Sequence, residues 1–353
     1  MFKKSKIMTM NSAGAFVAAL ALSTTSFAAE NLTVETASPG GAPHMSVSYL
    51  AQVAGEAGVA ELQVQAGQVS TNSVLNTAEG KTDIASTPLI LPFLLKMGRG
   101  PYSKQGKKGA ALASNLRALY PYNFGVYALF GFQSNGITSY DQLKGKTIYN
   151  GPPRGGALVT ARQILQLVAG IKEGKDYKGV QVNWGQSRKT ITDGTADINM
   201  VPTTIPSGSV TAALAAGKIN IISIPKKIWD SKKFQRFAQS PGSAPVAIKA
   251  SKLTYGKGVT VISEDGMFRS ISITGAEIVN KKMSNKLAKA LTAVYIKNLD
   301  KLKIKTPWAK NINAGVLNAK LSGFCGLAPM KYHPGAVVAW EEAGYKVPDC
   351  AKP

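Results

Sequence analysis

The sequence predicts an α/β fold built from two lobes that are joined by a hinge. The chain has 353 residues, which is enough for two domains of ordinary size, each with its own core. Its hydrophobic fraction of 44% and charged fraction of 17% are typical of a globular protein. Short strand-like runs alternate with helical runs, which favours a parallel sheet. Two such sets follow one another before the chain returns to the first, so we expect a clamshell.

The first 28 residues are typical of a secretory signal peptide. Three lysines within the first six residues precede an apolar stretch, Ala13–Leu22, and Ser26-Phe27-Ala28 offers small residues at the positions that a signal peptidase reads. About ten apolar residues are too few to cross a bilayer, which takes about twenty. We therefore expect residues 1–28 to be removed and the mature protein to act outside the cytoplasm.

The first lobe is predicted from residues 29–130 and 267–353. Its first helix, Met45–Ala57, places Leu50 and Ala54 on one face, which is the periodicity of an amphipathic helix. Its second helix begins in the run Ser70-Thr71-Asn72, whose residues are all competent N-caps. In chain order the expected elements are the strand Leu32–Thr36, the helix Met45–Ala57, the strand Leu62–Gln65, the helix Ser70–Glu79, the strand Thr82–Ser86, a flexible glycine-rich loop over Leu95–Ala110, a helix and a strand within Leu116–Phe130, the strand Arg269–Thr274, and the helices Lys286–Asn298 and Val337–Ala343.

The second lobe is predicted from residues 131–266. Strand-like and helical runs again alternate, so we expect a second parallel βαβ set. In chain order its expected elements are the strand Thr147–Tyr149, the helix Ala157–Ala169, the strand Val180–Trp184, the short helix Ser187–Thr192, the strand Ala196–Met200, the helix Gly208–Ala216, the strand Ile219–Ile224 and the basic helix Lys226–Phe237.

Four loops should lie at the carboxyl ends of these strands, where open α/β sheets bind their ligands. They are the loop Ser38–His44, the cap Ser70–Asn72, the turn Thr87-Pro88 and the turn Gly151–Ala157. The last turn suits an anion, because the first N–H groups of a helix have no internal partners and carry partial positive charge. Arg154 could add a bidentate pair to a carboxylate. A plain strand-to-helix connection with a solvated arginine is the alternative.

Catalytic and metal chemistry finds little support in the sequence. His44 and His333 are the only histidines, and they have no metal-ligand spacing, so we interpret both as structural or hydrogen-bonding residues. No Ser/His/Asp order, nucleophile elbow or paired carboxylates stand out, and no Gly-Lys-Ser/Thr follows the glycine-rich turn as a P-loop requires. We therefore expect no enzyme, no cofactor and no metal.

The two cysteines, Cys325 and Cys350, predict one disulfide, because an exported protein with an even count usually pairs them. Removal of residues 1–28 takes three lysines and no acidic residue from the net charge of +23, which leaves +20. Such a charge suits nucleic acid, an anionic membrane face, an acidic small ligand, or solubility alone under unusual pH or salt. The lysines are spread along the chain without a nucleic-acid motif, so we expect no nucleic-acid partner.

Several sequence blocks resemble one known family in their order along the chain. They are "GQVSTN", "LRALYP", "SYDQLKGKTIYNGPPRGGALVTARQIL" and "KYHPGAVVAWEEAGY". The family is that of the TAXI proteins, the solute-binding components of TRAP (tripartite ATP-independent periplasmic) transporters. The resemblance covers nearly the whole mature chain and is most specific in the block around the LKGK strand and in the HPGA block.

The resemblance implies a type II periplasmic-binding-protein fold, with a ligand cleft between two lobes that close by a hinge motion. It implies a monomeric periplasmic receptor for a small organic anion, a carboxylate or amino acid, that delivers its ligand to TRAP membrane subunits. A secreted enzyme on the same fold, or a sensor that passes the ligand to a signalling partner, remains the alternative. An enzyme would need an acid, base or nucleophile in the cleft.

Two loops depart from the family pattern where selectivity would be set. The family turn usually reads Pro-Gly-Ser-Gly-Thr, whereas this chain has Pro153-Arg154-Gly155-Gly156-Ala157, without either hydroxyl. The first loop, Gly40–His44, lacks the family's tyrosines. We therefore expect a ligand different from the family's best-known ones. The resemblance and the loop positions together predict these ligand-binding residues: Gly41, His44, Ser70, Thr71, Asn72, Thr87, Tyr120, Pro153, Arg154, Gly155, Gly156, Ala157, Thr203 and Thr204.

Overall fold

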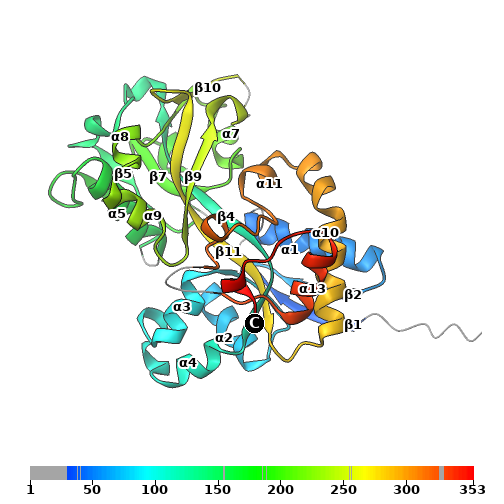
Figure 1. Cartoon of the computed structure of the whole chain (residues 1–353). Helices are drawn as coiled ribbons and strands as arrows, with labels where there is room; N and C mark the ends of the chain where they lie inside the picture. The colour runs from blue at the N-terminus through cyan, green and yellow to red at the C-terminus, as the bar shows by residue number, and fades with distance from the viewer. Residues whose placement is uncertain are drawn as a thin grey trace, which may run out of the picture.

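The computed structural model describes residues 30–37, 39, 41–153, 156–184, 186–187, 189–253, 255, 257–325 and 330–353, without the side chains of residues 307 and 308. The predicted signal peptide, residues 1–28, lies outside these ranges, as do Arg154 and Gly155. The predicted α/β class with two lobes is confirmed (Figure 1).

One mixed sheet runs through both lobes. Its order is β2-β1-β3-β11-β4-β7-β5-β6, with β8 paired to β4 and β10, and β9 paired to β11. The strands are β1 (Glu30–Glu35), β2 (Ala60–Gln65), β3 (Ile84–Pro88), β4 (Leu116–Phe132), β5 (Thr147–Tyr149), β6 (Lys178–Val180), β7 (Ile198–Thr203), β8 (Ile219–Ile222), β9 (Ser243–Lys249), β10 (Val259–Ile262) and β11 (Met267–Asn280).

Helices cover both faces of this sheet, and most begin within three residues of the position that the sequence pattern predicts. They are α1 (Ala42–Glu56), α2 (Ser70–Glu79), α3 (Ile90–Met97), α4 (Lys108–Ala113), α5 (Gly156–Val168), α6 (Lys189–Thr192), α7 (Gly208–Ala213), α8 (Lys226–Trp229), α9 (Lys232–Ala238), α10 (Asn285–Lys305), α11 (Pro307–Asn311), α12 (Ala319–Ser322) and α13 (Pro334–Glu342).

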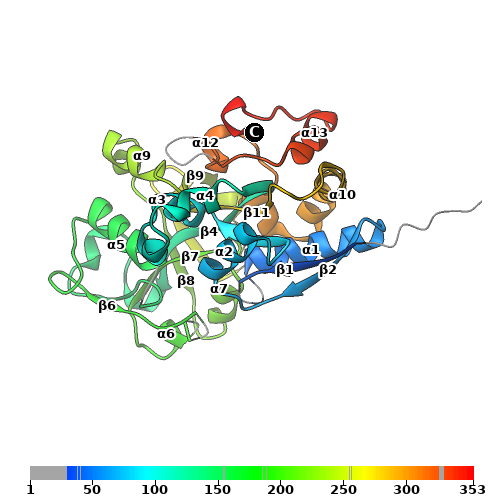
Figure 2. The same cartoon turned by 90° about the horizontal axis from the view of Figure 1, so that it is seen from below.

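Two long antiparallel strands, β4 and β11, connect the lobes (Figures 1 and 2). β4 has 17 residues and β11 has 14. The helix predicted within Leu116–Phe130 is therefore wrong. The run is rich in aromatic and aliphatic residues, which suit a strand that is buried on both faces. The predicted parallel pairing holds only for the outer strands, because β4, β9 and β11 form antiparallel pairs at the centre of the sheet.

The flexible loop predicted over Leu95–Ala110 is wrong as well. It holds the end of α3, a 3₁₀ turn at Gly100–Gln105 and the start of α4. Its glycines serve close packing: a Cβ on Gly109 would lie 2.1 Å from the carbonyl oxygen of Leu95. The basic helix predicted at Lys226–Phe237 is two helices, because the Ser231 hydroxyl accepts from the Phe234 N–H (3.2 Å) and starts α9 anew.

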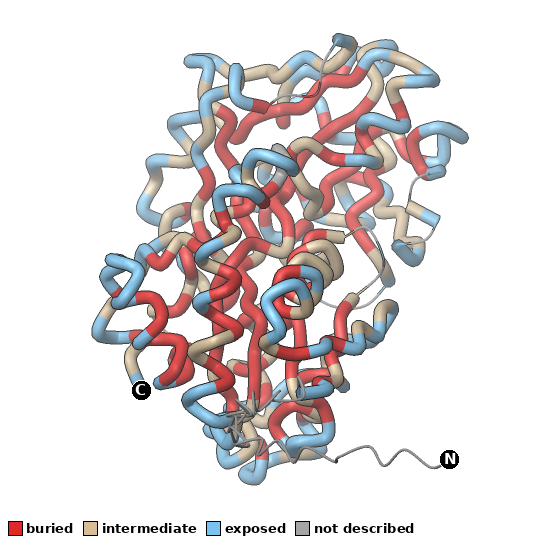
Figure 3. The backbone as a smooth tube through the Cα atoms, turned by 90° about the vertical axis from the view of Figure 1, so that its right-hand side faces the viewer, coloured by how far each residue is buried: buried red, intermediate tan, exposed pale blue. Residues whose placement is uncertain are grey.

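Each lobe has its own buried core. One cluster takes its residues from 32–122 and 276–351, and two others take theirs from 126–273, one on each face of the sheet. Buried residues run through the middle of the molecule, and exposed residues lie mostly at its edges (Figure 3). The predicted Cys325–Cys350 disulfide is confirmed, and it ties the C-terminal segment to the chain just before residues 326–329.

Candidate functional site

The helices α1 and α5 begin on the same face of the sheet. They lie over different halves of β4 and β11, the two strands that connect the lobes. The Ser86 hydroxyl of β3 donates to the Pro43 carbonyl (3.4 Å), so the first turn of α1 lies over β3. Glu277 of β11 is paired with Ser86 and therefore shares this face. Six residues earlier on β11, Ile271 points to the same side and packs in one core cluster with Leu165 of α5.

The Tyr127 hydroxyl of β4 donates to the Ala157 carbonyl (3.2 Å), which places the first turn of α5 over β4. Unpaired N–H groups and the positive end of the helix dipole therefore occur twice on this face, at Gly41–His44 and around Gly156. Gly41 and His44 are partly exposed, Pro153 and Gly156 are exposed, and Ala157 is partly exposed. The structure thus brings these five predicted residues to two helix starts on one face.

Glu173 holds the end of β5 in place, where the turn before α5 begins. Glu173 accepts from the Asn150 amide (2.6 Å) and from two nitrogens of Arg162 (2.8 Å each). The Arg162 guanidinium holds the pKa of Glu173 below its ordinary value. Asn150 is the last residue before the glycine and proline turn, so this network fixes where the turn leaves β5.

The start of α2 lies on the opposite face of the sheet. Asn76 of α2 donates to Glu35 (2.9 Å), and Glu35 points away from the α1 side. Ser70 and Thr71 are partly exposed and Asn72 is exposed. The predicted side-chain capping by this run is wrong: the N-cap is Val69, and it makes no side-chain cap. The role of Ser70, Thr71 and Asn72 in ligand binding therefore stays a prediction.

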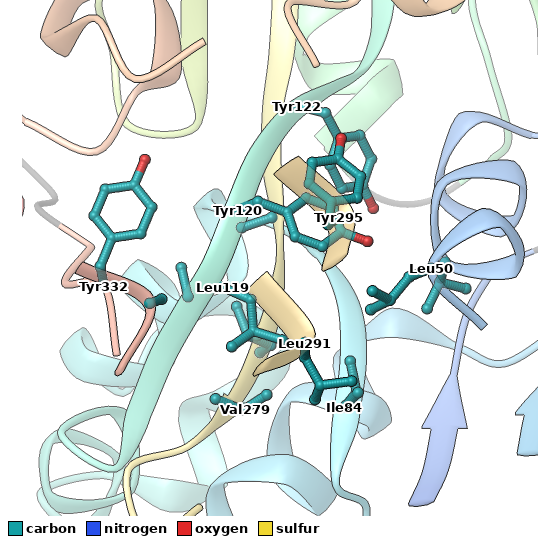
Figure 4. Close-up of a cluster of buried hydrophobic side chains, with 14 of the residues drawn as sticks. Leu50, Ile84, Leu119, Tyr120, Tyr122, Val279, Leu291, Tyr295 and Tyr332 are labelled. Carbon is teal, nitrogen blue, oxygen red and sulfur yellow. The ribbon is translucent and has the colours of Figure 1, made fainter. Parts of the chain in front are cut away.

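Two predicted residues of the first lobe are fully buried. Tyr120 stacks on Tyr295 of α10, with ring centroids 3.5 Å apart and an interplanar angle of 5° (Figure 4). Burial raises the pKa of Tyr120 well above its ordinary value. Thr87 is also buried, at the end of β3, and its hydroxyl makes no hydrogen bond with the described residues.

A buried polar cluster around Glu277 lies beneath the first turns of α1, and the sequence pattern did not point to it. Glu277 is 0% exposed, and Tyr120 and Ser86 flank it on the neighbouring strands. Among the described residues, no well-aligned hydrogen bond reaches either carboxyl oxygen, nor the hydroxyls of Tyr120, Tyr122 and Ser46. We name the five residues Glu277, Ser86, Tyr120, Tyr122 and Ser46 the Glu277 cluster.

Burial raises the pKa of Glu277 to about 7, and the nearby hydroxyls of Ser86, Tyr122 and Ser46 limit the rise. An acidic residue inside an apolar strand is a sequence signal for such a group. In the run "SITGAEIVN" it is the one carboxylate among mostly apolar and small residues.

A small cavity of about 90 Å³ lies in the second lobe, on the face opposite α5. Aromatic walls from Tyr149 and Trp184 meet polar groups from Asn199, Thr203 and Ser209. The Thr203 hydroxyl donates to Ser207 (2.6 Å), so its proton is already used in a hydrogen bond within the protein. Thr203 and Thr204 are both partly exposed. The cavity can hold a few waters or one small polar group.

Within the described ranges, no three His, Cys, Asp or Glu side chains lie together as a metal site. In that same part of the chain, no helix has the length and hydrophobicity needed to cross a membrane.

Comparison with known proteins gives one sequence family and several distant structures. The NMT1-like family matches residues 34–344. The aliphatic sulphonate binding protein SsuA of Escherichia coli is 12% identical, covers 90% of this chain and 88% of its own, and superposes with a TM-score of 0.43. DctP7 of Bordetella pertussis, a solute receptor that binds pyroglutamic acid, is 10% identical, with 90% and 93% covered and a TM-score of 0.44. None of the curated proteins compared matches the sequence.

Proposed function

Because the chain belongs to the NMT1-like family, which matches it over residues 34–344, we propose that it is a periplasmic solute-binding protein. In this proposal it captures a small organic anion, a carboxylate or an amino acid, and delivers it to the membrane subunits of a TAXI-type TRAP transporter. The sequence blocks that resemble TAXI proteins favour this transporter class.

One observation carries the proposal: α1 and α5 begin on one face of the sheet, on either side of the strands that connect the lobes. Two positive helix ends that flank a pair of crossing strands suit an anion held between them. The net charge of +20 in the mature chain adds a favourable long-range field for an acidic ligand.

We propose that residues 29–130 and 267–353 form one lobe and residues 131–266 the other. With this division, β4 and β11 supply the hinge, and ligand binding shifts the population toward a closed form that docks on the transporter. Gly41 and His44 would contact the ligand from the first lobe, and the turn Pro153–Ala157 and Thr203-Thr204 from the second.

A thermal-unfolding screen of the mature chain tests the proposal, because a ligand that binds only the folded state raises its melting temperature. The panel contains acetate, succinate, L-glutamate, 2-oxoglutarate, methanesulfonate and neutral sugars. We expect at least one anion, and no sugar, to raise the melting temperature and to bind with one site per chain in calorimetry. A melting temperature unchanged by every anion would contradict the proposal.

The role of Arg154 is tested on the same ligand with Arg154→Ala. Loss of a charge-assisted pair of roughly 1.5–3 kcal/mol should weaken binding about tenfold or more. Arg236→Ala is the matched control, because it removes the same charge from an exposed position on α9. Equal affinity of the two variants would show that Arg154 makes no contact.

A further inference from the structure

We propose that the Glu277 cluster makes anion binding at the start of α1 proton-coupled, so that Glu277 takes up a proton when the anion arrives. The inference rests on the proposed function, because it needs an anion at this helix start. It goes beyond that function because Glu277 would regulate binding without touching the ligand.

The geometry places one carboxyl group and one ligand position at the same helix end. Ser46 and Pro43, both in the first turns of α1, lie against Ser86 and Glu277 beneath them. A charged Glu277 gains stabilisation from the positive end of α1. An anionic ligand at Gly41–His44 draws on the same partial charge and repels the buried carboxylate through a medium of low polarity.

Among the residues that the structure describes, the elements packed around Glu277 offer it no counter-charge. β4 faces it with Tyr120 and Tyr122, α10 with Tyr295, α1 with Ser46 and β3 with Ser86. Burial raises the pKa of all three phenols well above the ordinary value, so they stay neutral between pH 5 and 9. The carboxyl group is therefore the titrating member of the cluster in this range.

The sign of the coupling follows from these contacts. Burial raises the pKa of Glu277 to about 7, and a second negative charge at the α1 start raises it further. Binding near neutral pH then takes up a fraction of one proton, and by reciprocity affinity for the anion rises as pH falls. Typical coupling of 5-fold or more predicts binding that is about fourfold or more tighter at pH 6 than at pH 8.5.

Calorimetry in buffers of different ionisation enthalpy counts the protons exchanged, with acetate, succinate, L-glutamate, 2-oxoglutarate and methanesulfonate as probes. We expect net proton uptake with each probe that binds wild-type protein at pH 7.5. Glu277→Gln should bind with the affinity of the acidic form at every pH and take up no proton. Glu35→Gln is the matched control, because Glu35 is a buried carboxylate on the opposite face of the same lobe.

His44 also lies in the first turn of α1, so the variant His44→Gln controls for any contribution of its imidazole. Uptake that persists in His44→Gln and disappears in Glu277→Gln supports the proposal. Net proton release, no exchange, or uptake that survives in Glu277→Gln overturns it and leaves the proposed function standing. Binding of none of the five probes to wild type instead overturns the proposed function, and this inference with it.

Discussion

The substitution Glu277→Gln should stabilise the unliganded protein at neutral and alkaline pH and change little at acid pH. Glutamine keeps the size of the side chain and stays neutral, so it reproduces the protonated acid. In the native chain Glu277 is 0% exposed and lacks a well-aligned hydrogen bond from the described residues, so its charged form is costly.

The magnitude follows from the difference in pKa between the native and unfolded chains. Burial moves the pKa from 4.5 to about 7, so the native state binds more protons than the unfolded state between these values. The contribution of Glu277 to the free energy of unfolding is therefore fully present below pH 4.5 and is lost as pH rises through 7. At about 1.36 kcal/mol per pKa unit, the loss is about 3 kcal/mol.

Urea unfolding of both proteins at pH 5 and pH 8.5 measures the effect. The difference in the free energy of unfolding, variant minus wild type, should grow by about 2 to 3 kcal/mol between these pH values. Taking the difference cancels the other carboxylates, whose titration both proteins share. A difference that is the same at both pH values would refute the assignment of a raised pKa to this buried carboxyl group.

Three further substitutions test the packing and the cross-link. Cys350→Ser opens the bridge to Cys325, which closes a sequence separation of 25, and should lower the free energy of unfolding by roughly 3 to 4 kcal/mol in urea titrations. Gly275→Ala places a Cβ 2.1 Å from the ring of Phe124, so it should cost about 1–3 kcal/mol; an unchanged melting temperature would contradict that contact. Tyr295→Phe removes a buried hydroxyl without a described partner and should be neutral or stabilising, as melting curves would show.

The outer elements of each lobe could be predicted from local pattern alone. The α2 bounds, Ser70–Glu79, and the β5 bounds, Thr147–Tyr149, agree with the sequence pattern because each run has clear punctuation on both sides. The centre of the sheet could not be predicted in this way. β4 and β11 are held as strands by pairing with each other, and their sequences lack a clear alternation of apolar and polar residues. Their long apolar runs fit a helix and strand as well as one long strand.

The candidate site was predicted where glycines and prolines mark helix starts. Gly41 and Gly156 lie at such starts, and both helices lie on one face of the sheet. The Glu277 cluster could not be predicted, because its members come from β3, β4, β11 and α1 and meet only through strand register and helix packing. Whether Tyr120 belongs to a ligand site or to a core depends on Tyr295, which is 175 positions away in the sequence.

Small-angle X-ray scattering of the mature chain tests the central claim, that a ligand held between two lobes closes them about β4 and β11. The measurement compares the protein alone with the protein saturated by the anion that raises its melting temperature most. We predict a smaller radius of gyration with ligand and no change with a non-binding sugar. An identical scattering curve with and without the saturating anion would contradict the account.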